Sequence, residues 1–173
     1  MDAAQRRQKI LELLRQSAQP ASAGMIAARF QVSRQVIVGD IALLRAANVN
    51  ISATPRGYIL VDQNARADEI IHTIACRHDN SNLAEELYTI VDNGCGLIDV
   101  IVEHAVYGQL SGQLQIFSRY DADNFMEKLA KEHAAPLSDL TEGIHLHTIS
   151  CRSEEAYQRV LEELKAKGIL FIK

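Results

Sequence analysis

The chain has 173 residues, of which 47% are hydrophobic and 23% charged, a composition that supports a packed core and differs from that of a disordered chain. At roughly 100–200 residues per domain, this length allows one ordinary domain or two small ones. The sequence contains no apolar run near the ~18 residues of a membrane span and opens on a polar segment unlike a signal peptide, so we expect a cytoplasmic protein without a membrane partner. The three cysteines include no CxxC pair, which argues against a disulfide framework and a cysteine-rich zinc finger.

Charge is distributed unevenly along the chain. Residues 1–66 contain nine lysines and arginines and four acidic residues, whereas residues 67–173 contain nine basic and eighteen acidic ones. All six histidines and all three cysteines also lie after residue 66. This asymmetry predicts two modules, a basic domain at 1–62 that lies near a polyanion and a second domain at 67–173 with a different task, joined by a short polar linker at 62–66.

The first module has the pattern of three helices followed by a hairpin. Apolar residues at helical spacing predict helices over 5–16 and about 25–31, and Ser33 is a good N-cap for a third helix. Two short β segments, 49–53 and 57–61, flank a Pro-Arg-Gly turn. Helix, helix, turn, helix and hairpin, in this order, form the plan of a winged helix-turn-helix domain, whose third helix enters the DNA major groove.

The segment 32–45 resembles the family of small bacterial winged-helix repressors, the class that also heads the biotin repressor. This resemblance implies double-stranded DNA as a partner and places six residues at the DNA: Ser33, Arg34, Gln35, Val36 and Val38 on the third helix and Arg56 at the tip of the wing. Val36 replaces the more usual Thr, and Gly39 replaces a Lys or Arg and costs the helix about 1 kcal/mol. The alternative is a three-helix interaction module with a solvated charged face, but the basic charge and Arg56 favour DNA.

The second module alternates strands and helices. We expect strands near 68–77, 97–105, 109–117, 143–151 and 168–173, and helices near 81–93, 122–133 and 153–167. This order predicts an α+β sandwich, with helices on one face of a mainly antiparallel sheet. We interpret Cys76 and Cys151 as small buried hydrophobic residues on strands and Cys95 as a turn residue between two glycines.

A His-x-His pair at 145 and 147 carries the sharpest chemical signal. On a strand, His145 and His147 point to the same face, where two imidazoles can converge on one cation, and we expect Ile144 and Leu146 to face the core. The alternative is an ordinary exposed strand that happens to carry two histidines. A third histidine, His78, ends the first strand of this module, and Glu86 follows eight residues later. If these two side chains meet the His145/His147 strand, the four together would suit zinc, nickel, iron or manganese. Glu85 points about 100° away from Glu86 around its helix, so we expect it to be solvated.

A longer set of motifs resembles the three-histidine (3H) regulatory domain, which follows a winged helix in the bacterial niacin-responsive repressors, the NiaR family. The motifs are His78 with Glu86 eight residues later, the run 99–108, and the run 142–148. Together with the preceding winged helix, the likeness covers essentially the whole chain in the right order. The resemblance implies repression of genes for NAD biosynthesis or niacin uptake, with nicotinic acid as the co-repressor. It also implies a transition metal, nickel or zinc foremost, held by His78, Glu86, His145 and His147.

The effector site is open to two interpretations. The functional one places His104, Tyr107, Arg77 and Ser111 around the niacin ring and its carboxylate. In the other, His104 is a core histidine that shares its strand face with its apolar neighbours. A pyridine carboxylate could also occupy an open position on the metal itself.

The predicted mechanism is that of a homodimeric repressor whose two winged helices contact half-sites in successive major grooves. Effector binding in the acidic module would shift the dimer toward the geometry that binds DNA. One alternative keeps the DNA-binding module and makes the metal itself the signal. Another makes the second module a metal-dependent hydrolase, but no separate acid/base lies beside the motif, so we expect no enzyme activity.

Overall fold

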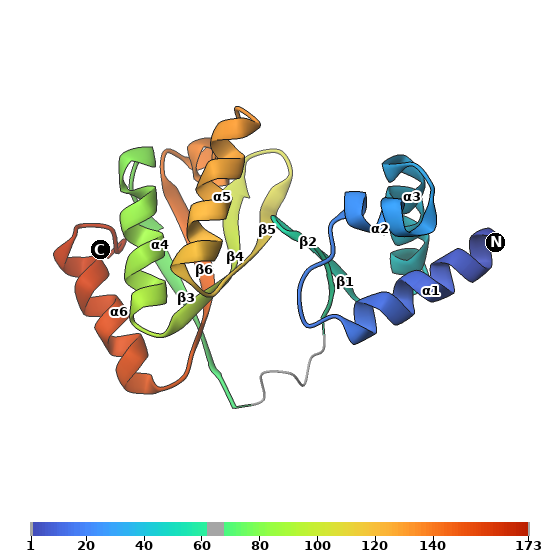
Figure 1. Ribbon diagram of the computed structural model, residues 1–173. Coiled ribbons are helices and arrows are strands. Elements are labelled where there is room, and N and C mark those ends of the chain that lie inside the picture. Colours follow the sequence, from blue (N-terminus) through green and yellow to red (C-terminus); the bar gives the residue numbers. More distant parts are fainter. Residues whose placement is uncertain (1, 62–67, 173) are drawn as a thin grey trace. The chain divides into compact units, whose positions relative to one another are not determined.

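The computed structural model describes residues 2–61 and 68–172, and the chain divides into two compact units, Met1–Ala65 and Arg66–Lys173 (Figure 1). Each unit has its own hydrophobic core. The predicted linker at 62–66 lies outside the described residues. Among the described helices, none is both long and apolar enough to cross a bilayer.

The first unit has the predicted winged helix-turn-helix order. Its elements are α1 (Ala3–Gln16), α2 (Ala23–Phe30), α3 (Arg34–Ala46), β1 (Ile51–Thr54) and β2 (Gly57–Leu60). Each helix begins after a residue whose side chain accepts a hydrogen bond from a backbone N–H of the first turn, which satisfies a donor that the helix leaves unpaired. These N-caps are Asp2, Ser22 and Ser33, so the predicted cap on the third helix is confirmed. Apolar side chains from all three helices, among them Ile10, Ile26, Ile37 and Ile41, fill the core.

A buried carboxylate fastens the third helix to the first. Asp40 on α3 is 4% exposed, and its Oδ2 accepts a hydrogen bond from Nε of Arg6 on α1 at 2.5 Å. Arg7 adds a second guanidinium at 3.6 Å. A buried charge is tolerated only when it is paired, so this ion pair fixes the orientation of α3 relative to α1.

The second unit is the predicted α+β fold, a four-stranded sheet with helices on one face (Figure 1). The strands, in the spatial order β3-β6-β4-β5, are all antiparallel to their neighbours. Their bounds are β3 (Ile70–Arg77), β4 (Cys95–His104), β5 (Gly108–Ile116) and β6 (Ile144–Cys151). The helices that cover the sheet are α4 (Leu83–Asp92), α5 (Arg119–Lys131) and α6 (Glu154–Ala166). Two 3₁₀ helices, η1 (Asn80–Asn82) and η2 (Leu137–Thr141), flank α4 and β6.

Two predicted elements differ from the structure. The strand expected at 168–173 is absent from the described residues, where Leu170 makes only an isolated bridge to Cys76 beyond the end of α6. The helix expected at 122–133 begins three residues earlier, at Arg119, because the side chain of Ser118 caps its first turn.

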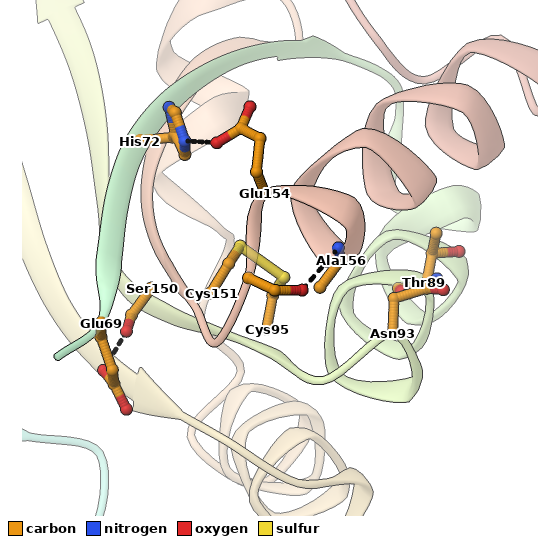
Figure 2. The surroundings of a disulfide bond; sticks show 10 residues. Glu69, His72, Thr89, Asn93, Cys95, Ser150, Cys151, Glu154 and Ala156 are labelled. Atoms are coloured by element: carbon orange, nitrogen blue, oxygen red, sulfur yellow. Dashed lines mark hydrogen bonds and ion pairs between the residues drawn. A yellow bond between two sulfur atoms is a disulfide. The ribbon is translucent and has the colours of Figure 1, made fainter.

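The interpretation of Cys95 and Cys151 as separate residues is wrong. Cys95 is buried at the start of β4, where it lies directly opposite Cys151 of β6 with a Cα–Cα distance of 4.3 Å, and the two form a disulfide (Figure 2). They are 56 positions apart in the sequence, which gives no local signal, because the register of β4 against β6 creates the contact. Cys76 is buried and free, as predicted.

Candidate metal centre

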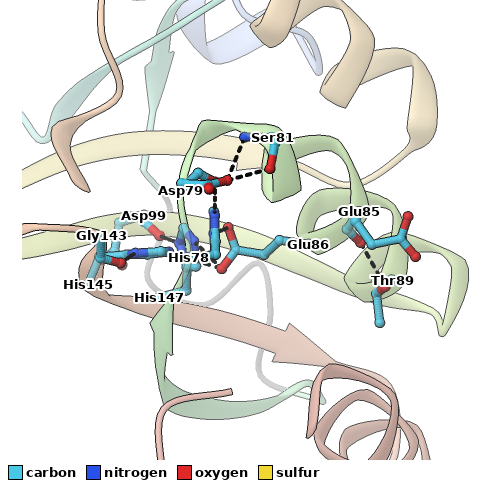
Figure 3. Close-up of polar contacts among 10 residues, drawn as sticks. All are labelled: His78, Asp79, Ser81, Glu85, Glu86, Thr89, Asp99, Gly143, His145 and His147. Carbon is cyan, nitrogen blue, oxygen red and sulfur yellow. Dashed lines mark hydrogen bonds and ion pairs between the residues drawn. The ribbon is translucent and has the colours of Figure 1, made fainter. Parts of the chain in front are cut away.

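Three imidazoles surround one buried carboxylate in the second unit (Figure 3). The side chain of Glu86 on α4 is 1% exposed; its Oε2 lies 2.7 Å from Nε2 of His78, and its Oε1 lies 2.9 Å from Nε2 of His145 and 3.4 Å from Nε2 of His147. The structure therefore brings together the four residues that the 3H resemblance implies as metal ligands. Glu85 points away from this cluster, is half exposed and pairs with Lys167, as expected for a solvated side chain.

The histidines of β6 face inward, which corrects the predicted orientation of that strand. His145 and His147 do share one face, but it is the buried one, and each is 3% exposed. Ile144, which we expected in the core, is 36% exposed on the opposite face. An imidazole is stable in the interior when its two nitrogens find partners, and here Glu86 and backbone carbonyls supply most of them.

Backbone carbonyls fix the tautomer of all three rings. A carbonyl oxygen can only accept a hydrogen bond, so each Nδ1 facing one carries a proton. Nε2 can then donate to the Glu86 carboxylate when the ring is protonated, and it offers its lone pair to a metal ion when the ring is neutral. The three pairs of Nδ1 and carbonyl are His78 with Asp79 at 2.6 Å, His145 with Gly143 at 2.9 Å, and His147 with Asp99 at 2.7 Å. Metal-binding histidines are usually oriented by such a hydrogen bond at the other nitrogen.

Two of these carbonyl acceptors depend on irregular backbone. The register of β4 against β6 shifts between Leu97 and Ile101, and within this irregularity the Asp99 carbonyl holds His147 while its Oδ1 accepts from the backbone N–H of Thr148 at 2.9 Å. Gly143 has a φ of +87°, and a Cβ there would lie 2.3 Å from the carbonyl oxygen of His78, so the site requires glycine. The sequence reasoning assigned no role to Asp99 or Gly143, although both lie in the motifs of the 3H resemblance.

The charges in the cluster support one another. Burial acts to raise the pKa of Glu86, but the three surrounding imidazoles outweigh it and hold that pKa well below its ordinary value. Burial acts to lower the pKa values of His78 and His147, but the carboxylate of Glu86 reverses this and raises both. Burial, followed by the neighbouring Glu86, raises the pKa of the Cys76 thiol.

The residues fit a transition-metal ion. Nε2 of His147 is buried and has no hydrogen-bond partner in the described part of the protein, although it points toward the Glu86 carboxylate. An ion among the three Nε2 atoms would give this nitrogen its missing partner. A further group of potential ligands consists of Cys76, Glu86 and His145, whose donor atoms all lie within 4.8 Å of one another. Imidazole nitrogens with a carboxylate are a donor set that zinc and nickel accept.

The predicted effector residues are spread over the sheet and the turn between β4 and β5. Arg77 on β3 and Ser111 on β5 lie on the two edge strands of the sheet, about 14 Å apart at the usual spacing between strands. His104 is half-buried, and its Nδ1 accepts the backbone N–H groups of Val106 and Tyr107, so it closes the turn between β4 and β5. Tyr107 is exposed.

An apolar cavity adjoins the metal centre instead. It has a volume of about 30 Å³ and reaches Glu86, His145 and His147 on one side. Its remaining wall is mainly apolar and includes Leu83, Val100, Leu114, Phe125 and Leu137. The sequence alone does not indicate this cavity, because its lining residues lie on α4, α5, η2, β4, β5 and β6, which are far apart along the chain.

The predicted DNA-contacting side chains lie on the surface of the first unit. Arg34, Gln35, Val36 and Val38 are exposed on α3. The hydroxyl of Ser33 accepts a hydrogen bond from the backbone N–H of Val36, so it caps the helix that presents them. Arg56 lies in the turn of the wing, where its guanidinium donates to Oε1 of Gln19 at 3.2 Å.

Comparison with known proteins matches both units. Residues 71–173 match the sequence profile of the 3H domain family, and residues 6–59 match that of an HTH domain family. The chain is 40% identical over 166 residues to the probable transcription repressor NiaR of Thermotoga maritima, and 42% identical over 171 residues to the transcription repressor NadR of Bacillus subtilis. Each alignment covers 96% of this chain and 93% of the relative. The chain belongs to the 3H-domain family of transcription repressors. In this 3H protein the predicted fold class and family are thus confirmed.

Proposed function

We propose that this 3H protein is a DNA-binding repressor of genes for NAD biosynthesis or niacin uptake, and that its second unit senses nicotinic acid at a metal centre. The observation that carries the proposal is the cluster of three buried imidazoles, each oriented by a backbone carbonyl so that its Nε2 faces Glu86. The chain joins this cluster to a winged helix, which fits a sensor of a small molecule that controls transcription in the cytoplasm. The names of its relatives support repression.

In this proposal, His78, Glu86, His145 and His147 hold a nickel or zinc ion. The ion supplies a Lewis-acidic position that a pyridine nitrogen or a carboxylate can occupy. The apolar cavity beside the centre suits the flat ring of nicotinic acid better than the scattered residues Arg77, Ser111, His104 and Tyr107 do. Its present volume is about that of one water molecule, so the ring enters only when Leu137 or Phe125 moves aside.

Contact with DNA in this proposal uses two kinds of residue. Arg34 and Gln35 at the start of α3 would contact base edges in the major groove, and Arg56 on the wing would contact the phosphate backbone. Val36 and Val38 offer apolar contact to a thymine methyl group.

A homodimer would place two winged helices on the two half-sites of an operator. The sheet face away from the helices supports pairing through the second unit, because it exposes apolar residues that include Ile71, Ile144 and Phe171. We expect the full-length chain to scatter light as a dimer and the Ile71→Lys variant to shift toward the monomer. A wild-type monomer at all concentrations would contradict the dimer.

The test of the function is binding to the DNA upstream of the protein's own gene neighbourhood, with and without nicotinic acid, in metal-loaded and metal-stripped protein. We expect nicotinic acid to tighten binding only when metal is present, and His147→Ala to abolish this response. His72→Ala is the matched control, because His72 stacks on Tyr157 and pairs with Glu154 outside the centre. Binding governed by metal alone would instead favour the metal-responsive repressor, and loss of specific DNA binding in every state would refute the proposal.

A further inference from the structure

Cys76 lies against the metal centre. It is fully buried on β3, directly opposite His145 of β6, and only two residues before His78. Its Sγ, a carboxylate oxygen of Glu86 and an imidazole nitrogen of His145 lie within 4.8 Å of one another. The thiol therefore shares the buried face of the sheet with the ligands that the family resemblance implies, although the resemblance does not include it.

Cys76 belongs to the hydrophobic core of the second unit, but it also lies near a buried carboxylate. The other two cysteines form the Cys95–Cys151 disulfide, which leaves Cys76 as the free thiol of the described chain. A cysteine that serves only as a small hydrophobic residue has no need of a carboxylate neighbour, and an ionised carboxylate against an apolar side chain is unfavourable. A second and independent observation points to a ligand at this site, because the buried Nε2 of His147 faces the same carboxylate without a hydrogen-bond partner.

We propose that Cys76 supplies a thiolate to the metal centre, so that the centre combines nitrogen, oxygen and sulfur donors. This inference rests on the proposed metal function of His78, Glu86, His145 and His147. Coordination replaces the S–H bond by a sulfur–metal bond, and the proton leaves to the solvent. A thiolate among imidazoles directs the site toward zinc, cobalt or nickel and away from manganese and magnesium, which prefer oxygen ligands.

Cobalt(II) is the probe that tests this inference, since a thiolate bound to cobalt gives a charge-transfer band in the near ultraviolet that imidazole and carboxylate ligands do not give. We expect the full-length, metal-stripped protein to develop this band on titration with cobalt(II). In the Cys76→Ser variant the band should disappear and the cobalt dissociation constant should rise about tenfold or more.

The control variant is Cys95→Ser/Cys151→Ser, which should keep the band. Cys151 lies six residues along β6 from His145, about 20 Å away, so neither its sulfur atom nor that of Cys95 reaches the same ion. Visible cobalt bands without the charge-transfer band in wild-type protein would overturn the thiolate and leave the metal centre standing. Absence of all cobalt and zinc binding would overturn both.

X-ray absorption at the zinc edge gives a second measurement that needs no variant to fold. A sulfur neighbour at about 2.3 Å in the zinc-loaded wild-type protein is the expected result. A first shell of nitrogen and oxygen alone would overturn the role of Cys76.

Discussion

The substitution Gly143→Ala tests whether the backbone around the metal centre is as constrained as the structure indicates. At a φ of +87°, an alanine is strained by about 1–2 kcal/mol. Its Cβ would lie 2.3 Å from the carbonyl oxygen of His78, which must move by about 1 Å to reach ordinary van der Waals contact. Such overpacking adds about 1–3 kcal/mol, so we expect a total loss of about 2–5 kcal/mol in the free energy of unfolding.

The same displacement should weaken metal binding. The backbone of His78 carries one ligand, and the carbonyl of Gly143 orients the ring of His145, so one methyl group disturbs two ligands. Loss of such orienting contacts lowers metal affinity 10–100-fold as an order of magnitude. Urea unfolding of the metal-free protein measures the first effect, and competition with a chromogenic zinc chelator measures the second.

Gly94→Ala is the matched control for this substitution. Gly94 has a similar φ of +78°, but a Cβ there meets no atom within 4 Å. The control should therefore lose only about 1–2 kcal/mol and keep its metal affinity. Equal losses in the two variants, or an unchanged zinc affinity in Gly143→Ala, would refute the argument that the close approach of Gly143 to His78 shapes the centre.

Three other predictions concern the buried ion pair, the DNA contact and the dependence on pH. Asp40→Asn removes the counter-ion that joins α1 to α3, so the melting temperature of the first unit, followed by circular dichroism, should fall by several degrees; an unchanged transition would contradict this role. Arg56→Ala should weaken DNA binding almost equally across sequences and reduce the slope of log K against log salt by about 1, whereas a change in sequence preference would argue against a phosphate contact. In metal-free protein the pKa values of His78 and His147 lie above the ordinary 6.5, and the pKa of Glu86 lies below the ordinary 4.5. The stabilisation that these groups give one another is therefore complete between pH 4.5 and pH 6.5. The free energy of unfolding should decrease when the pH is raised through the histidine pKa values, and also when the pH is lowered through the pKa of Glu86. Urea titrations that show no loss of stability on the alkaline side would contradict this coupling.

The elements of the first unit could be predicted because their signals are local. Ser33 caps α3 through a backbone N–H only three residues away, and the apolar spacing of α1 and α3 repeats within a few turns. The turn of the wing is marked by its own proline and glycine. In contrast, no local pattern indicates the ion pair of Asp40 with Arg6, which spans 34 residues and exists only because α1 and α3 pack together.

The second unit shows why a strand pattern identifies a shared face but not the side on which that face lies. Alternation correctly predicted that His145 and His147 point the same way, yet polarity suggested that the isoleucine and leucine between them lie inside. The opposite holds because α4 brings Glu86 over the histidines and so offers the imidazoles a buried polar partner. The proposed metal ligands come from the resemblance to the 3H domain, since the sequence spacing between Glu86 and β6 contains no geometric information.

Cys76 illustrates both limits of the sequence pattern, since neither its long-range contacts nor the side on which its strand face lies could be predicted. Its position two residues before His78 places it on the same face of β3 as that histidine, but the sequence pattern indicated only a small buried hydrophobic residue. Once the histidines are known to lie inside, the same alternation brings the thiol into the centre, and the antiparallel register places it directly opposite His145. The orientation of β6 therefore affects more than packing, because in the proposed metal centre it determines whether a soft sulfur ligand is available and thus which ions that centre would hold.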